Sequence, residues 1–367
     1  MSPADTTPEA GKKQPLPVYK RRRRRRIYTA VAVVVLVAAG VGGYAAAQGG
    51  GSTTEPNFTI STSTGSVADS DSIIATNSSV AATVPAHLHF IPFEAGVTAI
   101  AEMRSGSVQS ISGVGNPPTT EAIGEGTGIT VVLVQSFDAD QLLVPASVTT
   151  ASQLSGKSIG VLVGSSEDYE LRGWLRLQGL TSSVKLVEMD SEQAVAAAYV
   201  SHAIDAAYVY GSYATEVEGT GGHAITDAEQ IAKEGVAGID VVAVSSSLVN
   251  SDPSLIQKYV CAEVTATRDL TGAGSAKYLA QSASFQGITS VSQIIAATKA
   301  YPFIPLSQQL HWLGSTPGDT SSRLVQAYAQ TGQFLVQQGR LTTAPTAAEI
   351  AGHVDPTFVK NALNGDC

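Results

Sequence analysis

The sequence has few of the side chains that build metal centres and reactive sites. Only 2 cysteines and 6 histidines occur in 367 residues, and two cysteines do not make a zinc site. His87 and His89 alternate along one predicted strand, so both rings share a face, yet no third ligand lies near them in the sequence. A Walker loop, a G-x-S-x-G turn and a G-x-G-x-x-G turn after a strand are all missing. We therefore expect no metal, no cofactor and no catalytic activity.

Basic residues are scarce once the first 47 residues are set aside. The chain holds 22 lysines and arginines against 31 aspartates and glutamates. Nine of the basic residues and two of the acidic ones lie in residues 1–47, which leaves 13 against 29 for the rest. Nucleic-acid binding depends on basic surfaces, so this balance argues against it. A hydrophobic content of 43% is ample for a folded core.

A long uncharged stretch lies near the N-terminus, directly after six arginines. Residues 27–47 are rich in Val and Ala, and about 20 apolar residues span a bilayer as a helix. Basic residues before such a segment stay on the cytoplasmic side. We expect a cytoplasmic tail at 1–26, a transmembrane anchor or signal segment at 27–47 and a linker at 48–56, with the body outside the cytoplasm. Ala45–Ala47 also fits a cleavage site, so anchorage and secretion both stay open.

The two cysteines lie far apart in the sequence, at Cys261 and Cys367. Neither follows the apolar stretch directly, which excludes a lipid-modified N-terminal cysteine. Outside the cytoplasm two cysteines usually pair. A bridge between them would tie the C-terminus to a helix of the body, and two free thiols are the alternative.

Strands and helices alternate along the rest of the chain. Such alternation predicts an α/β fold with mostly parallel sheets and helices on both faces. A first series of units starts near residue 57 and a second starts near residue 150. The predicted strands are 58–64, 87–93, 108–114, 128–135, 157–163, 184–189, 206–210 and 239–249.

The two series predict two lobes, which the chain connects twice. We expect the first lobe to comprise 57–140 and 245–367, and the second to comprise 141–244. Extended crossovers near 136–148 and 240–246 would join them and allow hinge bending. A cleft beyond the carboxyl ends of the strands is where α/β proteins bind ligands.

Small polar residues follow a strand and begin a helix at two places. Ser165 and Ser166 do so in the second lobe, and Asn116 does so in the first. Free N–H groups and the positive end of a helix attract an anion. The alternative is a plain helix cap with nothing bound. Glu167 and Asp168 favour that alternative in the second lobe, because they already satisfy the helix dipole.

The stretch IDAAYVYGSYATEV, residues 204–217, ends a predicted strand in aromatic rings. Tyr208 and Tyr210 share one strand face, so both could simply pack into the core. A phenol at a strand end can also stack on a ligand and donate a hydrogen bond. Asp140 and Asp240 fall on the predicted crossovers, where a carboxylate could hold an ammonium group or merely be solvated.

Five stretches together resemble the taurine- and aliphatic-sulfonate-binding proteins of ABC importers, a family similar to the nitrate- and thiamine-precursor-binding proteins. The resemblance covers roughly residues 57–350. It implies a type II periplasmic-binding fold, in which two α/β lobes close on a ligand. The stretches are GKSIGVLVGSSEDYELRGWL (156–175), IDAAYVYGSYATEVEGTGGHAITDAEQIA (204–232), GIDVVAVSSSLVNSDPSLIQKY (238–259), AYPFIPLSQQLHWLG (300–314) and TGQFLVQQGRL (331–341).

The resemblance also implies which residues bind. A sulfonate would be held by hydroxyls and amides at helix starts, with a crossover carboxylate for a ligand ammonium group. Asn116 stands where the family usually has a serine, and Val242 stands where it usually has an aromatic residue. The expected ligand-binding residues are Asn116, Asp140, Ser165, Ser166, Tyr210 and Asp240.

These observations predict an exported, monomeric, non-enzymatic solute-binding protein. It would capture a small anion or zwitterion, taurine above all, and deliver it to an ABC permease and its ATPase. The alternatives are an alkanesulfonate, nitrate, bicarbonate or thiamine precursor as ligand. A pyrimidine-synthase-like enzyme on the same fold is a further alternative, but it would need a reactive histidine in the cleft. A ligand sensor is another, but a cytoplasmic part of about 26 residues is too short for a signalling domain.

Overall fold

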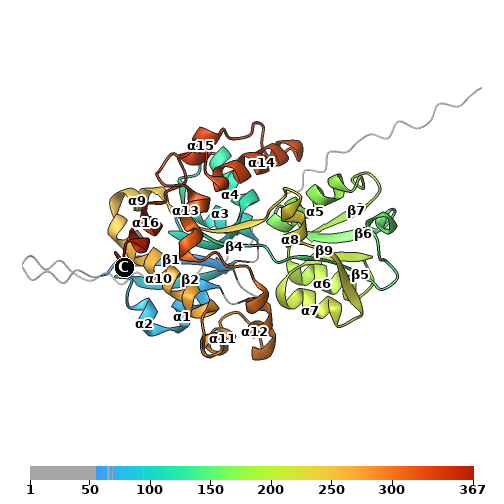
Figure 1. Cartoon of the computed structure of the whole chain (residues 1–367), viewed down its shortest axis with the longest axis horizontal. Coiled ribbons are helices and arrows are strands. Elements are labelled where there is room, and N and C mark those ends of the chain that lie inside the picture. The colour runs from blue at the N-terminus through green and yellow to red at the C-terminus, as the bar shows by residue number, and fades with distance from the viewer. Residues whose placement is uncertain (1–54, 64–66, 68, 94) are drawn as a thin grey trace, which may run out of the picture. The chain divides into compact units, whose positions relative to one another are not determined.

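The structure, a computed structural model, describes residues 55–63, 67, 69–93 and 95–367 (Figure 1). The predicted cytoplasmic tail, the predicted membrane segment and almost all of the predicted linker lie outside the described residues. Within the described part of the chain, no helix is both long enough and apolar enough to cross a bilayer.

The first lobe is built on a five-stranded sheet with the order β2-β1-β3-β10-β4. Strand β1 pairs in parallel with β2 and β3, whereas β10 runs antiparallel to β3 and β4. The apolar strand β4 is buried along nearly its whole length. The bounds are β1 Asn57–Ser63, β2 His87–Phe93, β3 Ser110–Gly115, β4 Ile129–Phe137 and β10 Ile239–Ser245.

The second lobe repeats the pattern with the order β7-β6-β8-β5-β9. Here β6 is parallel to β7 and β8, and β5 is antiparallel to β8 and β9. In both sheets the antiparallel strand is the one that arrives from the other lobe. The sheets are therefore mixed: four of the five strands in each run in one direction, as the prediction of mostly parallel sheets requires, and one strand is reversed. The bounds are β5 Gln141–Pro145, β6 Ser158–Leu162, β7 Lys185–Met189, β8 Ala206–Val209 and β9 Gly222–Asp227.

Helices cover both sheets, and the two lobes lie side by side in Figure 1. The second lobe carries α5 Ser166–Leu177, α6 Glu192–Val200, α7 Gly211–Glu218 and α8 Ala228–Lys233. The first lobe carries α1 Ser70–Thr76, α2 Ser78–Ala81, α3 Gly96–Ser105, α4 Asn116–Gly124, α9 Ser246–Ser251, α10 Pro253–Thr271, α11 Ser275–Ser282, α12 Val291–Ala300, α13 Gln309–Leu313, α14 Arg323–Gln337, α15 Ala347–Ala351 and α16 Thr357–Leu363.

The crossovers are shorter than predicted, and the second lies earlier. Strand β4 ends at Phe137 and β5 begins at Gln141, so the first crossover is only 138–140. Strand β10 begins at Ile239 within the first sheet, which places residues 239–244 in the first lobe and not in the second. The apolar run of β10 hides this boundary, because nothing in its composition marks the change of lobe.

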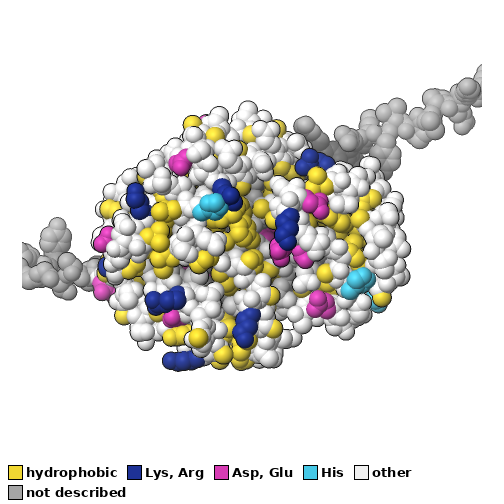
Figure 2. Space-filling view, viewed as in Figure 1, with side chains coloured by type: hydrophobic (Ala, Val, Ile, Leu, Met, Phe, Trp, Pro, Cys, Tyr) yellow, Lys and Arg dark blue, Asp and Glu magenta, His cyan; other side chains and the backbone are white. Residues whose placement is uncertain are grey.

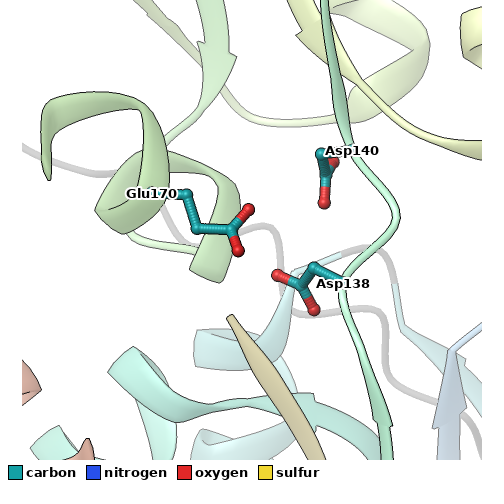
Figure 3. A group of neighbouring side chains, drawn as sticks. All are labelled: Asp138, Asp140 and Glu170. Carbon is teal, nitrogen blue, oxygen red and sulfur yellow. The ribbon is translucent and has the colours of Figure 1, made fainter. Parts of the chain in front are cut away.

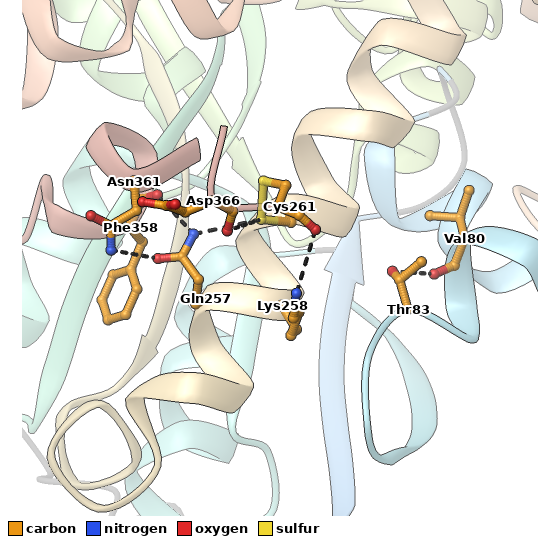
Figure 4. The surroundings of a disulfide bond; sticks show 9 residues. Val80, Thr83, Gln257, Lys258, Cys261, Phe358, Asn361 and Asp366 are labelled. Carbon is orange, nitrogen blue, oxygen red and sulfur yellow. Dashed lines mark hydrogen bonds between the residues drawn. A yellow bond between two sulfur atoms is a disulfide. The ribbon is translucent and has the colours of Figure 1, made fainter. Parts of the chain in front are cut away.

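A disulfide joins Cys261 of α10 to the C-terminal Cys367 (Figure 4). Hydrogen bonds beside it also connect α10 to the C-terminal helix. The Gln257 side chain donates to the Phe358 carbonyl at 3.0 Å and accepts from the Asn361 amide at 2.9 Å. The last residues are thus fixed to the body of the first lobe.

The lobes touch each other on one side of the crossovers. The rings of Tyr169 on α5 and Phe334 on α14 pack edge to face with centroids 5.1 Å apart. A Cβ atom on Gly115 would lie 2.8 Å from the Ser166 hydroxyl oxygen, so glycine allows the start of α4 to approach the start of α5. The two lobes are therefore closed on each other.

Candidate ligand-binding site

A cavity of about 60 Å³ lies between the lobes where both crossovers pass. A water molecule needs roughly 10–15 Å³ of such space, so the cavity suits a solute of a few heavy atoms. Its wall combines residues of both lobes. They include Ser63, Asp69, Phe93, Gly115, Gln135, Asp138, Asp140, Ser165, Ser166, Glu167, Tyr210, Asp240, Tyr301 and Phe303.

The structure places five of the six predicted binding residues on this wall: Asp140, Ser165, Ser166, Tyr210 and Asp240. Tyr208 lies behind it instead. That ring is fully buried, and its hydroxyl donates to Glu170 at 2.7 Å. Of the two alternatives for these tyrosines, packing into the core therefore applies to Tyr208, and a place on the cavity wall applies to Tyr210.

Asn116 does not lie on the wall. Its side-chain amide donates to the Thr331 hydroxyl at 2.7 Å, and its oxygen accepts from the Ile239 N–H at 3.1 Å. These bonds join α4 to α14 and to the first residue of β10. The prediction of Asn116 as a ligand contact is corrected by this geometry, because the amide is used to hold the second crossover.

The helix that begins at Asn116 offers few donors to an anion. Its N-cap is Gly115, and after Asn116 prolines occupy the second and third helical positions, Pro117 and Pro118. Proline has no N–H, so two of the groups that normally remain free in a first helical turn are missing. The start of α4 is a poor anion site.

The start of α5 is already occupied by its own residues. The Ser165 hydroxyl donates to the Leu162 carbonyl at 2.7 Å and accepts from the Asp168 N–H at 3.2 Å. Glu167 and Asp168 lie in the first turn of the helix. Ser165 is therefore a helix cap, and Ser166 remains as the hydroxyl of this loop that faces the other lobe.

Carboxyl groups dominate the charge of the cavity. Asp69, Asp138, Asp140, Glu167 and Asp240 line it, and no lysine or arginine appears among the described residues of its wall. On the face of the molecule shown in Figure 2, charged side chains are few and scattered.

Burial changes the protonation of these acids. Desolvation raises the pKa of Asp240 from 3.8 to about 7, against the opposing hydrogen bond from Tyr301, whose hydroxyl lies 2.9 Å away. Desolvation and repulsion from neighbouring carboxylates also raise the pKa values of Asp138 and Asp140 well above 3.8. An empty cavity thus favours neutral carboxyls, and a bound cation would favour charged ones.

Several residues of the wall escaped the sequence analysis. Asp138 lies two positions before Asp140 on the same crossover, and that D-x-D spacing was a usable signal. Glu167 was interpreted only as a partner of the helix dipole. Tyr301 comes from a segment 61 residues after Asp240, so no local pattern could connect it to the site.

Comparisons with known proteins agree with this architecture. The sequence model of the NMT1-like family matches residues 121–284. The taurine-binding periplasmic protein of Escherichia coli strain K12 is 24% identical over 276 residues, which is 73% of this chain and 82% of that protein.

Solved structures show the same fold. The periplasmic aliphatic sulphonate binding protein SsuA from Escherichia coli has a TM-score of 0.66 at 16% identity, covering 80% of this chain and 91% of that one. The alkanesulfonate-binding protein SsuA from Xanthomonas axonopodis pv. citri, bound to MOPS, also has a TM-score of 0.66, at 18% identity, covering 82% and 98%. The chain is thus similar to taurine- and aliphatic-sulfonate-binding proteins, and these likenesses, with its two-lobed topology, show that it has the periplasmic-binding fold.

Proposed function

We propose that the chain is the extracytoplasmic solute-binding component of an ABC importer. The observation that carries this proposal is the cavity, which is closed between two lobes and lined by polar residues from both. The two short crossovers would act as hinges, so the lobes would open to admit the solute and close around it. The closed form would then deliver the solute to a permease and its ATPase.

The solute best suited to the cavity is a small zwitterionic sulfonate such as taurine. Relatives of this chain are named for taurine and for aliphatic sulfonates. A sulfonate alone would compensate none of the acids that line the wall, and any of them that ionised would repel it where water is excluded. Taurine adds an ammonium group that Asp240 can hold, while the hydroxyls of Ser63 and Ser166 offer neutral donors for the sulfonate.

Binding without catalysis agrees with the side chains present. Both cysteines are joined in the disulfide, so neither offers a free thiol. The described residues of the cavity wall include no histidine that could act as a general base. A disulfide also suits a protein outside the cytoplasm, where residues 27–47 would hold it at the membrane if they remain uncleaved.

Calorimetric titration of the purified protein tests this proposal. Wild-type protein should bind taurine more tightly than ethanesulfonate. A hydrogen bond to a charged group contributes about 1.5–3 kcal/mol, so Asp240→Asn should weaken taurine about tenfold to a hundredfold and change ethanesulfonate much less. Asp319→Asn, a partly exposed acid that does not line the cavity, is the matched control. Equal losses for both solutes would remove the ammonium role of Asp240.

A further inference from the structure

Three carboxyl groups converge at the first crossover, at the junction of the lobes. Asp138 and Asp140 lie on the crossover itself, and Glu170 reaches them from α5 (Figure 3). One oxygen of each lies within 4.8 Å of the others. All three side chains are almost fully buried, with 5%, 1% and 1% of their surface exposed.

The three groups differ in their hydrogen bonds. Glu170 is fixed in place, because one oxygen accepts from the Tyr208 hydroxyl and the other from the Gly238 N–H, both at 2.7 Å. Among the residues that the structure describes, none donates a hydrogen bond to Asp138 Oδ2 or Asp140 Oδ1. A buried carboxyl oxygen without a donor costs free energy, so these two oxygens indicate a missing partner.

The backbone of the second crossover is shaped to admit this group. A Cβ atom on Gly238 would lie 2.0 Å from Asp138 Oδ2 and 2.8 Å from Glu170 Oε1. Any other residue at this position would push the carboxyls apart. The second crossover thus holds a glycine where the acids of the first crossover and of α5 approach it most closely.

The groups around Asp138 and Asp140 are further carboxyls. The charged groups that act most strongly on Asp138 and Asp140 are all carboxylates: Glu167, Asp240 and Glu192, besides each other and Glu170. Such a group can be neutralised by protons or by a cation that enters the cavity. A proton neutralises one carboxyl at a time, whereas a cation between the three groups would neutralise them together and give the two donorless oxygens a partner.

We propose that Asp138, Asp140 and Glu170 form a cation subsite at the edge of the solute cavity, whose wall includes the two aspartates. As a statement about the solute, this inference rests on the proposed solute-binding function. The shared chemistry is a positive charge held by carboxylate oxygens, and it has two possible sources. One is the ammonium group of the solute, which makes charge-assisted hydrogen bonds. The other is a divalent metal ion, since oxygen ligands suit Ca²⁺ and Mg²⁺.

The subsite changes the expected order of ligands. Net charge then matters more than the sulfonate, so a small diamine should bind at least as well as taurine and both should bind better than ethanesulfonate. This order of affinities distinguishes the cation subsite from a single contact to Asp240. A single contact to Asp240 makes no prediction for a solute that lacks a sulfonate.

The experiment is calorimetry of metal-free purified protein with taurine, ethylenediamine, ethanesulfonate, Ca²⁺ and Mg²⁺, before and after Asp138→Asn. We expect the substitution to weaken whichever cation binds by at least tenfold. The matched control is Glu263→Gln, a fully buried acid that does not line the cavity, which should leave affinities unchanged. Unfolding midpoints of both variants check that the fold is intact.

The outcomes separate the two proposals. Cationic solutes that depend on Asp138 identify the solute as the source of the charge. Metal binding that depends on Asp138, with no solute bound, keeps the subsite and removes the proposed transport role. The subsite would be overturned if taurine and ethanesulfonate bind equally well and Asp138→Asn changes the affinity of neither solute nor of a metal ion. The solute-binding function would still stand in that case.

Discussion

Two groups of buried acids in this molecule have the same chemistry and different surroundings. The cavity acids, Asp138, Asp140, Glu167 and Asp240, line a space between the lobes that a solute can enter, and Glu170 lies beside the first two. The core acid pair, Asp71 and Glu263, is fully buried within the first lobe, where α1 packs on α10.

The difference lies in what can neutralise each group. Burial and repulsion from Glu263 raise the pKa of Asp71 well above 3.8, and its oxygen accepts from the Tyr259 hydroxyl at 3.2 Å. A sealed pair like this one can lose its charge only by keeping a proton. The cavity acids can instead be neutralised by a ligand, so the core pair governs stability and the cavity acids govern binding.

The largest effect on the stability side should come from the disulfide on α10. The bridge closes a segment with a sequence separation of 106 residues, and losing a native disulfide typically costs about 2–5 kcal/mol. The double variant Cys261→Ser with Cys367→Ser should lose stability of that size in urea unfolding. Taurine affinity below the transition should stay the same, because the bridge is remote from the cavity wall. Altered affinity in a folded variant would show that the two regions are coupled.

A smaller effect on both stability and binding should come from Gly238→Ala. The added methyl group would collide with Asp138 and Glu170, and overpacking costs about 1–3 kcal/mol. Thermal unfolding and calorimetry should show lower stability and weaker binding together. Gly128→Ala, where a Cβ would meet nothing within 4 Å, is the control. Unchanged taurine affinity in Gly238→Ala would mean that binding does not depend on the close approach of Gly238 to Asp138 and Glu170.

Asp69 connects the two groups, since it lines the cavity and also faces Glu263. Burial raises its pKa from 3.8 to about 7, so the folded state favours the neutral carboxyl. This contribution to stability is complete below pH 4 and is lost as the pH rises to 7. Asp69→Asn should therefore lose less stability than wild type between pH 5 and pH 8, by about 2–3 kcal/mol.

Urea unfolding at both pH values measures this difference. Asparagine can still cap α1, where Asp69 now accepts from the Ser72 N–H at 2.8 Å. The helix should therefore survive the substitution. Identical pH dependence in the variant and in wild type would show that Asp69 is charged in the folded protein.

The smallest effect should come from Gly115→Ala at the contact between the lobes. A methyl group there would lie 2.8 Å from the Ser166 hydroxyl oxygen, which a small shift of one lobe could relieve. We expect a few-fold loss of taurine affinity with little change in the unfolding midpoint. A large fall in stability instead would mean that Gly115 matters to the first lobe and not to closure.

Much of the fold could be predicted from the sequence, because alternating strands and helices leave a clear pattern. The two-lobed α/β fold is confirmed, whereas the second crossover was placed too late. Strand β10 shows one continuous apolar run, and only its pairing with β3 and β4 assigns it to the first lobe.

The site was harder to predict, because its contacts connect distant segments. The role of Asn116 depends on Thr331 and Ile239, more than 120 residues away. Asp138 and Glu167 looked like ordinary acids until the fold placed them on one wall. The wall residues predicted at Ser166, Tyr210 and Asp240 stand at strand ends, helix starts or crossovers, where the local sequence does carry a signal.

The central claim is that a positive charge on the solute is held by carboxylates between the lobes. A crystal structure of the protein with taurine tests it most directly. The account predicts the taurine nitrogen within about 2.7–3.2 Å of Asp240 and of Asp138 or Asp140, with the sulfonate directed to Ser63 or Ser166. A sulfonate seated among the carboxyl groups, with the nitrogen facing neutral residues, would contradict it.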